Sequence, residues 1–349
     1  MRKSTWIVSR FLYFVILAVC VPVRCYGQAP DVGTIARLDP ALDQLIAPDA
    51  KIEKIASGFK FVEGPVWVRK PGYLLFSDIP ANVIDKWTPD GKISPVVKPS
   101  GFTGTDDSLA GVPITNGFET VYLIGSNGVT LDKQGRIVFA AHGDRAIIRI
   151  EKNGKRTVLA DRYEGKRLNS PNDLVYRSDG TLYFSDPTAG LRPVNREFPQ
   201  KELPFNGVYL ITKDGTLRLA TKDVTFPNGL AFSPDEKYLY VDDTAKKLIT
   251  RFEVQPDGSL GVGTLFFDMS SLKEPGVADG MKLDKKGNLY CTGPGGVLVI
   301  SPEGKLLGTI TAPELPANLT FGDSDGKTLY MAARTGLYRM RVKSEGIRP

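Results

Sequence analysis

The sequence predicts an all-β fold, a six-bladed β-propeller in which an N-terminal strand closes the last blade. Three observations support this prediction. One short pattern occurs six times, each copy joins a short apolar strand to an aromatic-rich strand, and no long stretch within the copies has the 3.6-residue period of a helix. Repeats at intervals of roughly 40–55 residues are typical of solenoids and propellers.

Each copy contains a polar residue near Gly or Pro, a short apolar strand, a turn and an aromatic-rich strand. The six copies are VEGPVWVRKPGYLLFSD (62–78), SNGVTLDKQGRIVFAAHG (126–143), SPNDLVYRSDGTLYFSD (170–186), FPNGLAFSPDEKYLYVDD (226–243), ADGMKLDKKGNLYCTG (278–293) and ANLTFGDSDGKTLYMAAR (317–334). Further hairpins are predicted by the turns PDG (89–91), NG (153–154), DG (214–215), PDG (256–258) and EG (303–304). Asn-Gly and Asp-Gly supply the positive φ of tight turns, so each copy predicts four strands, the content of one propeller blade.

The two ends of the repeat region predict how the ring closes. The sixth copy reaches LYRMRVK (337–343) and stops one strand short. A strand at 51–57 is expected to complete this blade and to remove an exposed sheet edge. We therefore expect an N-terminal extension at 28–50 and the propeller at 51–345. Two insertions, 99–125 and 187–206, are either lids over a binding site or surface elaborations.

The first 27 residues predict a secretory signal peptide. Arg2 and Lys3 precede an apolar run at 11–23, and small residues follow near Gly27. This order of basic, apolar and small residues is typical of export signals. The alternative is a membrane anchor, but the run of about 13 residues is shorter than the roughly 20 that span a bilayer. We expect an exported protein, periplasmic or secreted, without stable membrane insertion after cleavage.

Charge and cysteine content exclude some classes of function. Four of the 45 basic residues lie in the predicted signal peptide, which leaves 41 basic against 39 acidic residues. No block of Lys and Arg accompanies this balance, so nucleic-acid binding is not expected. Cys20 and Cys25 leave with the leader, and Cys291 alone cannot form an internal disulfide. Stability must therefore come from a large apolar core.

The polar residue that opens each copy predicts a metal site. The first strand of a propeller blade lines the central channel, so residues at the same phase of the six repeats converge there. These residues are Glu63, Asn127, Asn172, Asn228, Asp279 and Asn318. Carboxylate and amide oxygens suit Ca²⁺, whereas Zn²⁺ would be expected to recruit His or Cys. Asn-Gly could instead simply form turns, but Glu63 in Val-Glu-Gly-Pro does not fit that alternative.

Four motifs in order resemble the SMP-30/gluconolactonase family. They are EGPVW (63–67), SPND (170–173), FPNGLAFSPD (226–235) and DGM (279–281), and the resemblance covers roughly residues 50–345. KRLNSPND, YFSDP and PDEKYLYV are similar to its bacterial gluconolactonase branch. The resemblance implies a six-bladed propeller with one axial divalent cation, often Ca²⁺ with Zn²⁺ or Mg²⁺ as possibilities, and hydrolysis of sugar lactones.

The resemblance also implies roles for individual residues. Glu63, Asn228 and Asp279 match metal ligands, and Asn172 matches a residue that binds either the metal or the substrate. Asn127 shares their phase and is a further candidate for substrate binding. Asn318 shares it too, without an assigned role.

Hydrolysis of a lactone needs a polarised carbonyl and a base that takes a proton from water. Asp279 is the first candidate for the base. Asp186 in YFSDP is the alternative base, unless it only forms the turn before Pro187. His142 and Arg145 are candidates for substrate binding, but a lone His is often structural and a loop Arg is often only solvated.

The sequence therefore predicts an exported, monomeric hydrolase that opens a sugar lactone, D-glucono-1,5-lactone in the first place, to the aldonic acid. Two rival hypotheses remain. One is a broader lactonase or phosphotriester hydrolase, which could use the same metal chemistry. The other is a propeller without catalytic activity that binds a ligand or a protein, because propellers serve many functions.

Overall fold

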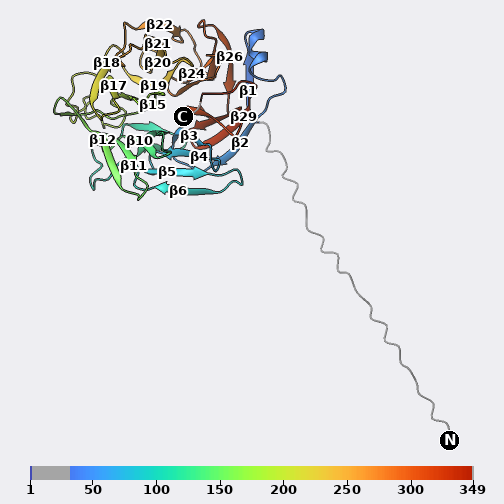
Figure 1. Ribbon diagram of the computed structural model, residues 1–349, viewed down its shortest axis with the longest axis horizontal. Helices are drawn as coiled ribbons and strands as arrows, with labels where there is room; N and C mark the ends of the chain where they lie inside the picture. Colours follow the sequence, from blue (N-terminus) through green and yellow to red (C-terminus); the bar gives the residue numbers. More distant parts are fainter. Residues whose placement is uncertain (2–31, 348–349) are drawn as a thin grey trace.

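Six antiparallel sheets surround a central channel in the computed structural model, which describes Met1 and residues 32–347 (Figure 1). The predicted signal peptide, 1–27, lies outside the described residues apart from Met1. The predicted fold class is confirmed. The only helix in the described part is a short 3₁₀ helix, and no described helix is long and apolar enough to cross a membrane.

Each blade contains four strands that run in chain order from the channel to the rim, except where an N-terminal strand joins. Blade 1 contains β3 (Val62–Val68), β4 (Tyr73–Asp78), β5 (Val83–Trp87) and β6 (Ile93–Val97). Blade 2 contains β9 (Ser126–Leu131), β10 (Ile137–Ala141), β11 (Ala146–Ile150) and β12 (Arg156–Ala160). Blade 3 contains β15 (Leu174–Tyr176), β16 (Leu182–Asp186), β17 (Gly207–Ile211) and β18 (Leu217–Thr221).

The second half of the ring repeats this arrangement. Blade 4 contains β19 (Pro227–Phe232), β20 (Tyr238–Asp243), β21 (Leu248–Glu253) and β22 (Thr264–Asp268). Blade 5 contains β23 (Met281–Leu283), β24 (Leu289–Gly293), β25 (Gly296–Ile300) and β26 (Leu306–Thr311). Blade 6 contains β27 (Asn318–Gly322), β28 (Thr328–Ala333) and β29 (Gly336–Arg341). The glycines of the predicted hairpin turns have positive φ in every case.

The N-terminal strand β2 (Ile52–Ser57) closes the ring as predicted. It pairs antiparallel with β29, with Ile52 opposite Met340, and so supplies the outer strand of blade 6. The chain before it adds two elements that the sequence did not predict. Strand β1 (Thr34–Arg37) pairs with β26 as a fifth strand of blade 5, and the 3₁₀ helix η1 (Pro40–Gln44) follows. Leu42 in η1 and Ile46 just after it are completely buried, so this part of the chain belongs to the core.

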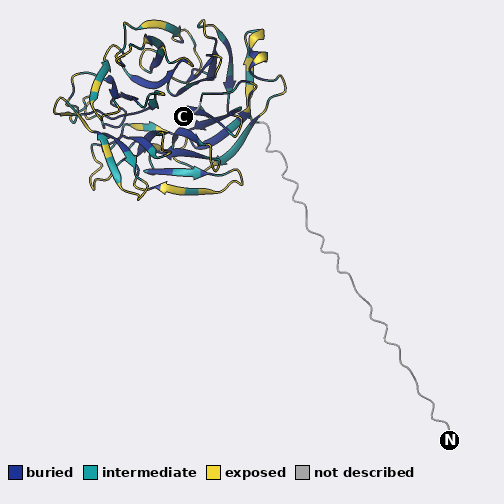
Figure 2. Ribbon diagram, in the orientation of Figure 1, coloured by how far each residue is buried: buried dark blue, intermediate teal, exposed yellow. Residues whose placement is uncertain are grey.

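The core is divided into six apolar clusters, one at each interface between neighbouring blades. Figure 2 shows the buried strands in dark blue and the exposed rim in yellow. The alternation of strand side chains explains this division, since successive residues point to opposite faces of a sheet. On β4, Leu74 and Phe76 pack toward blade 6, whereas Leu75 packs toward blade 2. A strand buried on both faces needs apolar residues at consecutive positions, as the six copies have.

The two insertions lie where the sequence predicted them, and they pack against each other. The first contains a hairpin of β7 (Pro113–Thr115) and β8 (Thr120–Tyr122). Gly111 N–H donates to the Gly190 carbonyl at 2.7 Å, and Val112 N–H donates to the Ala189 carbonyl at 3.1 Å. Between β12 and β15, a small hairpin is formed by β13 (Arg162–Tyr163) and β14 (Lys166–Arg167).

Candidate active site and metal centre

In blades 1, 2 and 4, an irregularity of the inner strand lies at the polar residue that opens it. The β3–β4 pairing shifts between Glu63 and Val66, and the β19–β20 pairing shifts between Pro227 and Leu230. Such bulges re-aim a side chain. The hydroxyl of Ser185 on β16 donates to the Asn228 carbonyl at 2.6 Å and so fixes this stretch of backbone to the neighbouring blade.

Close packing of the inner strands explains the glycine that follows four of the six polar residues. A Cβ on Gly64 would lie 2.1 Å from the Asn127 carbonyl oxygen, and a Cβ on Gly229 would lie 2.0 Å from the Asp279 carbonyl oxygen. Any other residue would collide with the next blade. Asn228-Gly229 therefore lies inside β19 rather than in a turn, and the interpretation of this Asn-Gly as a simple turn signal is wrong.

Five of the six predicted axial residues line one cavity of about 400 Å³ at the start of the inner strands. They are Glu63, Asn127, Asn172, Asn228 and Asp279. This volume falls within the usual range for small-ligand pockets. Most of the remaining wall is apolar, and much of it comes from Phe61, Ile79, Ile114, Leu123, Ala189, Val277, Leu315 and Pro316.

The amide oxygens at this cavity lack partners. The Oδ1 atoms of Asn127, Asn172 and Asn228 are buried and accept no hydrogen bond within the described part of the chain. Asn228 is held by its nitrogen, because Nδ2 donates to Thr244 Oγ1 at 3.1 Å. Buried polar atoms normally have partners, so three unpartnered oxygens around one cavity are available to a bound ion, ligand or water. Oxygen atoms from amides and carboxylates fit a hard cation such as Ca²⁺ or Mg²⁺.

The two carboxylates at the cavity complete an all-oxygen donor set. Burial raises the pKa of Glu63 to about 7, although the Gly64 amide opposes the shift by donating to Glu63 Oε2 at 2.7 Å. Burial, followed by the charge of Glu63, raises the pKa of Asp279. Two buried carboxylates that repel each other are stabilised by a cation between them. The described residues contain no cluster of three or more His, Cys, Asp or Glu side chains that could hold a metal. A cation in this cavity would therefore need the amide oxygens as ligands in addition to the two carboxylates.

The two insertions close one side of the cavity. Ile114 and Thr115 of β7 lie in its wall together with Leu123 from the first insertion and Ala189 from the second. The lid interpretation of the insertions therefore fits their place at the cavity. Arg334, in the turn between β28 and β29, also lines the cavity and was not selected from the sequence.

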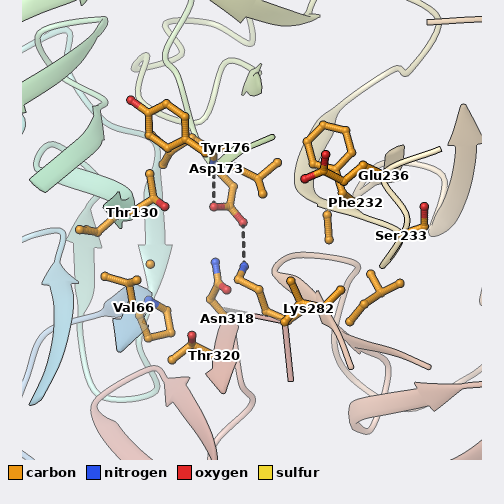
Figure 3. Close-up of a pocket in the computed structure, with 18 of the residues that line it drawn as sticks. Val66, Thr130, Asp173, Tyr176, Phe232, Ser233, Glu236, Lys282, Asn318 and Thr320 are labelled. Carbon is orange, nitrogen blue, oxygen red and sulfur yellow. Dashed lines mark hydrogen bonds and ion pairs between the residues drawn. The ribbon is translucent and has the colours of Figure 1, made fainter. Parts of the chain in front are cut away.

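Asn318 does not line this cavity. Its Oδ1 accepts from Leu319 N–H at 2.8 Å, and the residue lies in a second cavity of about 120 Å³ at the other end of the inner strands. Figure 3 shows Asp173, Lys282 and Asn318 pointing toward one another in this second cavity. Lys282 Nζ lies 3.8 Å from Asp173 Oδ2. The channel therefore has two different ends. One end contains the amides and carboxylates of the first cavity, and the other contains the ion pair of Asp173 and Lys282.

Asp186 is buried, but it is not among the residues that line the candidate site. Its Oδ2 accepts from Asn169 N–H at 2.8 Å and its Oδ1 accepts from Ser170 N–H at 2.7 Å. Burial raises the pKa of Asp186 to about 7, against the effect of these two amides. The carboxylate thus supports the backbone that leads to Asn172. This geometry favours the structural alternative for Asp186 over the role of base.

His142 and Arg145 also lie outside the cavity wall. His142 is fully buried behind Gly190, and burial lowers the pKa of its imidazole to about 4. Arg145 is buried and donates from Nε to the carbonyls of Leu168 and Asn169 at 2.7 and 3.0 Å. Both residues support the loops around the cavity in this geometry, and their predicted contact with substrate stays a prediction.

The comparisons with known proteins point to one family. The family model described as SMP-30/Gluconolactonase/LRE-like region matches residues 61–335. A gluconolactonase of Zymomonas mobilis is 39% identical over 328 residues, which cover 90% of this chain and 88% of that protein. The solved structure of a gluconolactonase of Xanthomonas campestris is 31% identical, with a TM-score of 0.75 and coverage of 91% of this chain and 99% of that chain.

A more distant structure shares the fold alone. Regucalcin of Agrobacterium tumefaciens, described as a calcium-binding protein, is 16% identical, with a TM-score of 0.65 and coverage of 84% of this chain and 95% of that chain. The family match spans most of the propeller and includes the predicted axial residues that line the large cavity. The chain therefore belongs to the SMP-30/gluconolactonase/LRE-like family.

Proposed function

We propose that this protein hydrolyses sugar lactones, with D-glucono-1,5-lactone as the first substrate to test and D-gluconate as its product. The observation that carries the proposal is the set of three unpartnered amide oxygens beside two carboxylates in a lactone-sized cavity. The two gluconolactonase relatives support lactone hydrolysis in general.

The residues that would hold the cation are Glu63, Asn172, Asn228 and Asp279. A divalent cation bound there would polarise the lactone carbonyl and stabilise the oxyanion that forms on attack. Calcium is proposed first because the donor set is all oxygen and because the distant regucalcin is described as calcium-binding. Asn127 lies in the same wall and is proposed to orient the hydroxyl groups of the sugar.

The reaction also needs transfer of a proton. Two carboxylates line the cavity, Glu63 and Asp279. We assign this step to Asp279, because it is less buried than Glu63. Asp279 would take a proton from the attacking water, the bond between the carbonyl carbon and the ring oxygen would break, and the ring oxygen would receive the proton. The apolar wall of the cavity limits access of other water molecules.

Activity measurements separate this proposal from the two rivals. Purified protein would be treated with a chelator, and opening of glucono-1,5-lactone would then be followed by a pH indicator with and without added Ca²⁺. We expect metal-dependent turnover that falls by at least about 100-fold in Asp279→Asn, because loss of a general base typically costs 10²–10⁴-fold. Asp223→Asn is the matched control, since that side chain is exposed and makes no hydrogen bond with the described residues.

The alternatives predict different outcomes. Turnover of a phosphotriester at a rate equal to that of the lactone would favour the broader hydrolase. Tight binding of Ca²⁺ without turnover of any lactone would contradict the proposal and favour a binding propeller. We also propose that the protein is exported and monomeric, which cell fractionation and size-exclusion chromatography would test.

A further inference from the structure

The cavity of about 400 Å³ that contains the axial residues has one basic side chain in its wall, Arg334. Arg334 is half-buried in the cavity wall, and its side chain makes no hydrogen bond or ion pair within residues 32–347. The hairpin of the first insertion lies close to it, since a Cβ on Gly117 would lie 3.5 Å from Arg334 Nη1. A guanidinium has five N–H donors, so an unpaired one in the cavity wall is available to bind a ligand there.

The backbone holds Arg334 firmly toward the cavity. Its carbonyl accepts from Val62 N–H at 2.8 Å, and the next residue, Thr335, donates from N and Oγ1 to Glu314 at 2.8 and 2.6 Å. The φ of Arg334 is 46°, and Arg334 is the first residue of the two-residue turn between β28 and β29.

Comparison of the two arginines shows what is specific to Arg334. Arg145 is buried and donates to two backbone carbonyls, so its guanidinium serves the fold. Arg334 also lies between the second and third strands of its blade, directly after β28, but its donors are free for a molecule in the cavity. The connection between these two strands therefore carries a structural arginine in one blade and an available arginine in another.

Charge defines what this arginine would bind. The ionisable residues in the cavity wall are Glu63, Asp279 and Arg334. A divalent cation would balance the two negative charges of Glu63 and Asp279. The guanidinium of Arg334 would then be the remaining charge in the cavity wall. Guanidinium groups bind carboxylate, phosphate and sulfonate groups through paired hydrogen bonds. The lactone carbonyl belongs at the amide and carboxylate end, so such a group would lie on another part of the sugar.

We propose that Arg334 is a specificity-determining residue that selects lactones carrying an anionic substituent over neutral ones. This inference rests on the proposed lactonase function, whose site it extends. The substrate class is a sugar lactone with a carboxylate, phosphate or sulfonate away from the lactone carbonyl. A reaction that oxidises an acidic sugar at its anomeric carbon would supply such a substrate.

The test compares two lactones that differ only in the substituent at one carbon. D-Glucaro-1,4-lactone carries a carboxylate where D-glucono-1,4-lactone carries a hydroxymethyl group. The readout is the ratio of their kcat/KM values within each variant, so that a misfolded fraction cancels. We expect a ratio above one in the wild-type protein and a decrease of about 10- to 100-fold in Arg334→Gln, mainly through KM, because bonds to charged groups contribute that much. Arg334→Lys should recover part of the ratio.

A second cation near the same opening provides the matched control. Lys60 is exposed, precedes the cavity-lining Phe61 and is not itself in the wall. Lys60→Gln should keep the wild-type ratio, which would exclude a general effect of net charge. A wild-type ratio below one, or an unchanged ratio in Arg334→Gln, would overturn the inference.

Binding of the products separates this inference from the proposed function. Calorimetric titration with glucarate and gluconate needs no turnover. If no lactone is hydrolysed, the proposed function fails, but a preference for glucarate that disappears in Arg334→Gln would still support anion recognition. Equal affinity for glucarate and gluconate in the wild-type protein would overturn it.

Discussion

Asp186 and Asp279 are acids near the same channel, and their surroundings give them different tasks. Asp279 lies in the cavity wall beside Glu63 and the unpartnered amide oxygens. Asp186 has each carboxylate oxygen engaged by a backbone amide, one from Asn169 and one from Ser170. Because Asp186 lies outside the cavity wall and both its oxygens face backbone amides, it is poorly placed to take a proton from substrate water.

The pKa of Asp186 predicts how stability depends on pH. Burial raises this pKa to about 7 in the folded protein, from an ordinary value of 3.8. Between these values the folded state binds a proton that the unfolded state does not bind. The contribution of Asp186 to the free energy of unfolding should therefore fall as the pH rises from about 4 to about 7, by up to about 1.4 kcal/mol per pH unit, and then remain constant.

Urea denaturation at several pH values would measure this effect. Asp186→Asn carries no titrating proton, so its free energy of unfolding should change less steeply over the same range. The comparison concerns the slope and not the absolute stability, because the amide also weakens one of the two backbone contacts. Parallel slopes for the two proteins would show that Asp186 ionises in the folded state as it does in the unfolded state.

The sequence predicted the axial residues better than the other members of the site. Glu63, Asn127 and Asn228 share one phase of a repeated strand, and the fold carries that phase to one axis. His142 and Arg145 were selected because they follow an inner strand, but the direction of a side chain after a strand depends on tertiary packing. Arg334 was missed for the same reason. The signal that could have found it is its place at the end of the sixth copy, directly after the aromatic-rich strand.

The two insertions form one structural unit. An isolated bridge between Ala110 and Leu191 and the bonds from Gly111 and Val112 connect them across blades. Gly190 lies at the centre of this contact, where an added Cβ would be 2.6 Å from both His142 Cβ and Ser170 Oγ. Ser170 lies in the loop that leads to Asn172, and His142 begins the turn after β10, so an added Cβ would press on both segments.

Gly190→Ala should therefore disturb the lid and the site together. Overpacking a buried position typically costs 1–3 kcal/mol, so we expect a decrease of about that size in the free energy of unfolding. Displacement of Ala189 from the cavity wall should raise the KM for the lactone severalfold. Gly261→Ala is the control, because its nearest atom would be Gln255 Nε2 at 3.4 Å. Unchanged KM and stability in Gly190→Ala would contradict a coupled lid.

For the whole molecule, the ring was predictable because it is repeated, whereas the N-terminal segment was not. Six copies of one alternating pattern indicate six blades, and the missing strand of the sixth copy indicates closure. The pattern around β1 is too short to reveal a strand, since its pairing with β26 exists only in the folded ring. Leu42 and Ile46 are apolar residues in a short helical turn, and only the packing shows that they cover blades 5 and 6.

Closure by β2 predicts the effect of shortening the chain. A protein that starts at residue 32 retains β1, η1 and β2, so we expect it to elute as one species and to melt like the full chain. A protein that starts at residue 51 loses Leu42, Leu45 and Ile46 from the core and should melt at a lower temperature, because each buried aliphatic side chain contributes about 1.5–3 kcal/mol.

A protein that starts at residue 58 also loses β2 and exposes β29 as an unpaired edge. Exposed edges pair with other chains, so this protein should elute as aggregates in size-exclusion chromatography. The three lengths separate the loss of apolar burial from the loss of ring closure, since only the shortest lacks β2. If the protein starting at residue 58 remained monomeric with the melting temperature of the protein starting at 51, closure by β2 would contribute nothing to the stability of the ring.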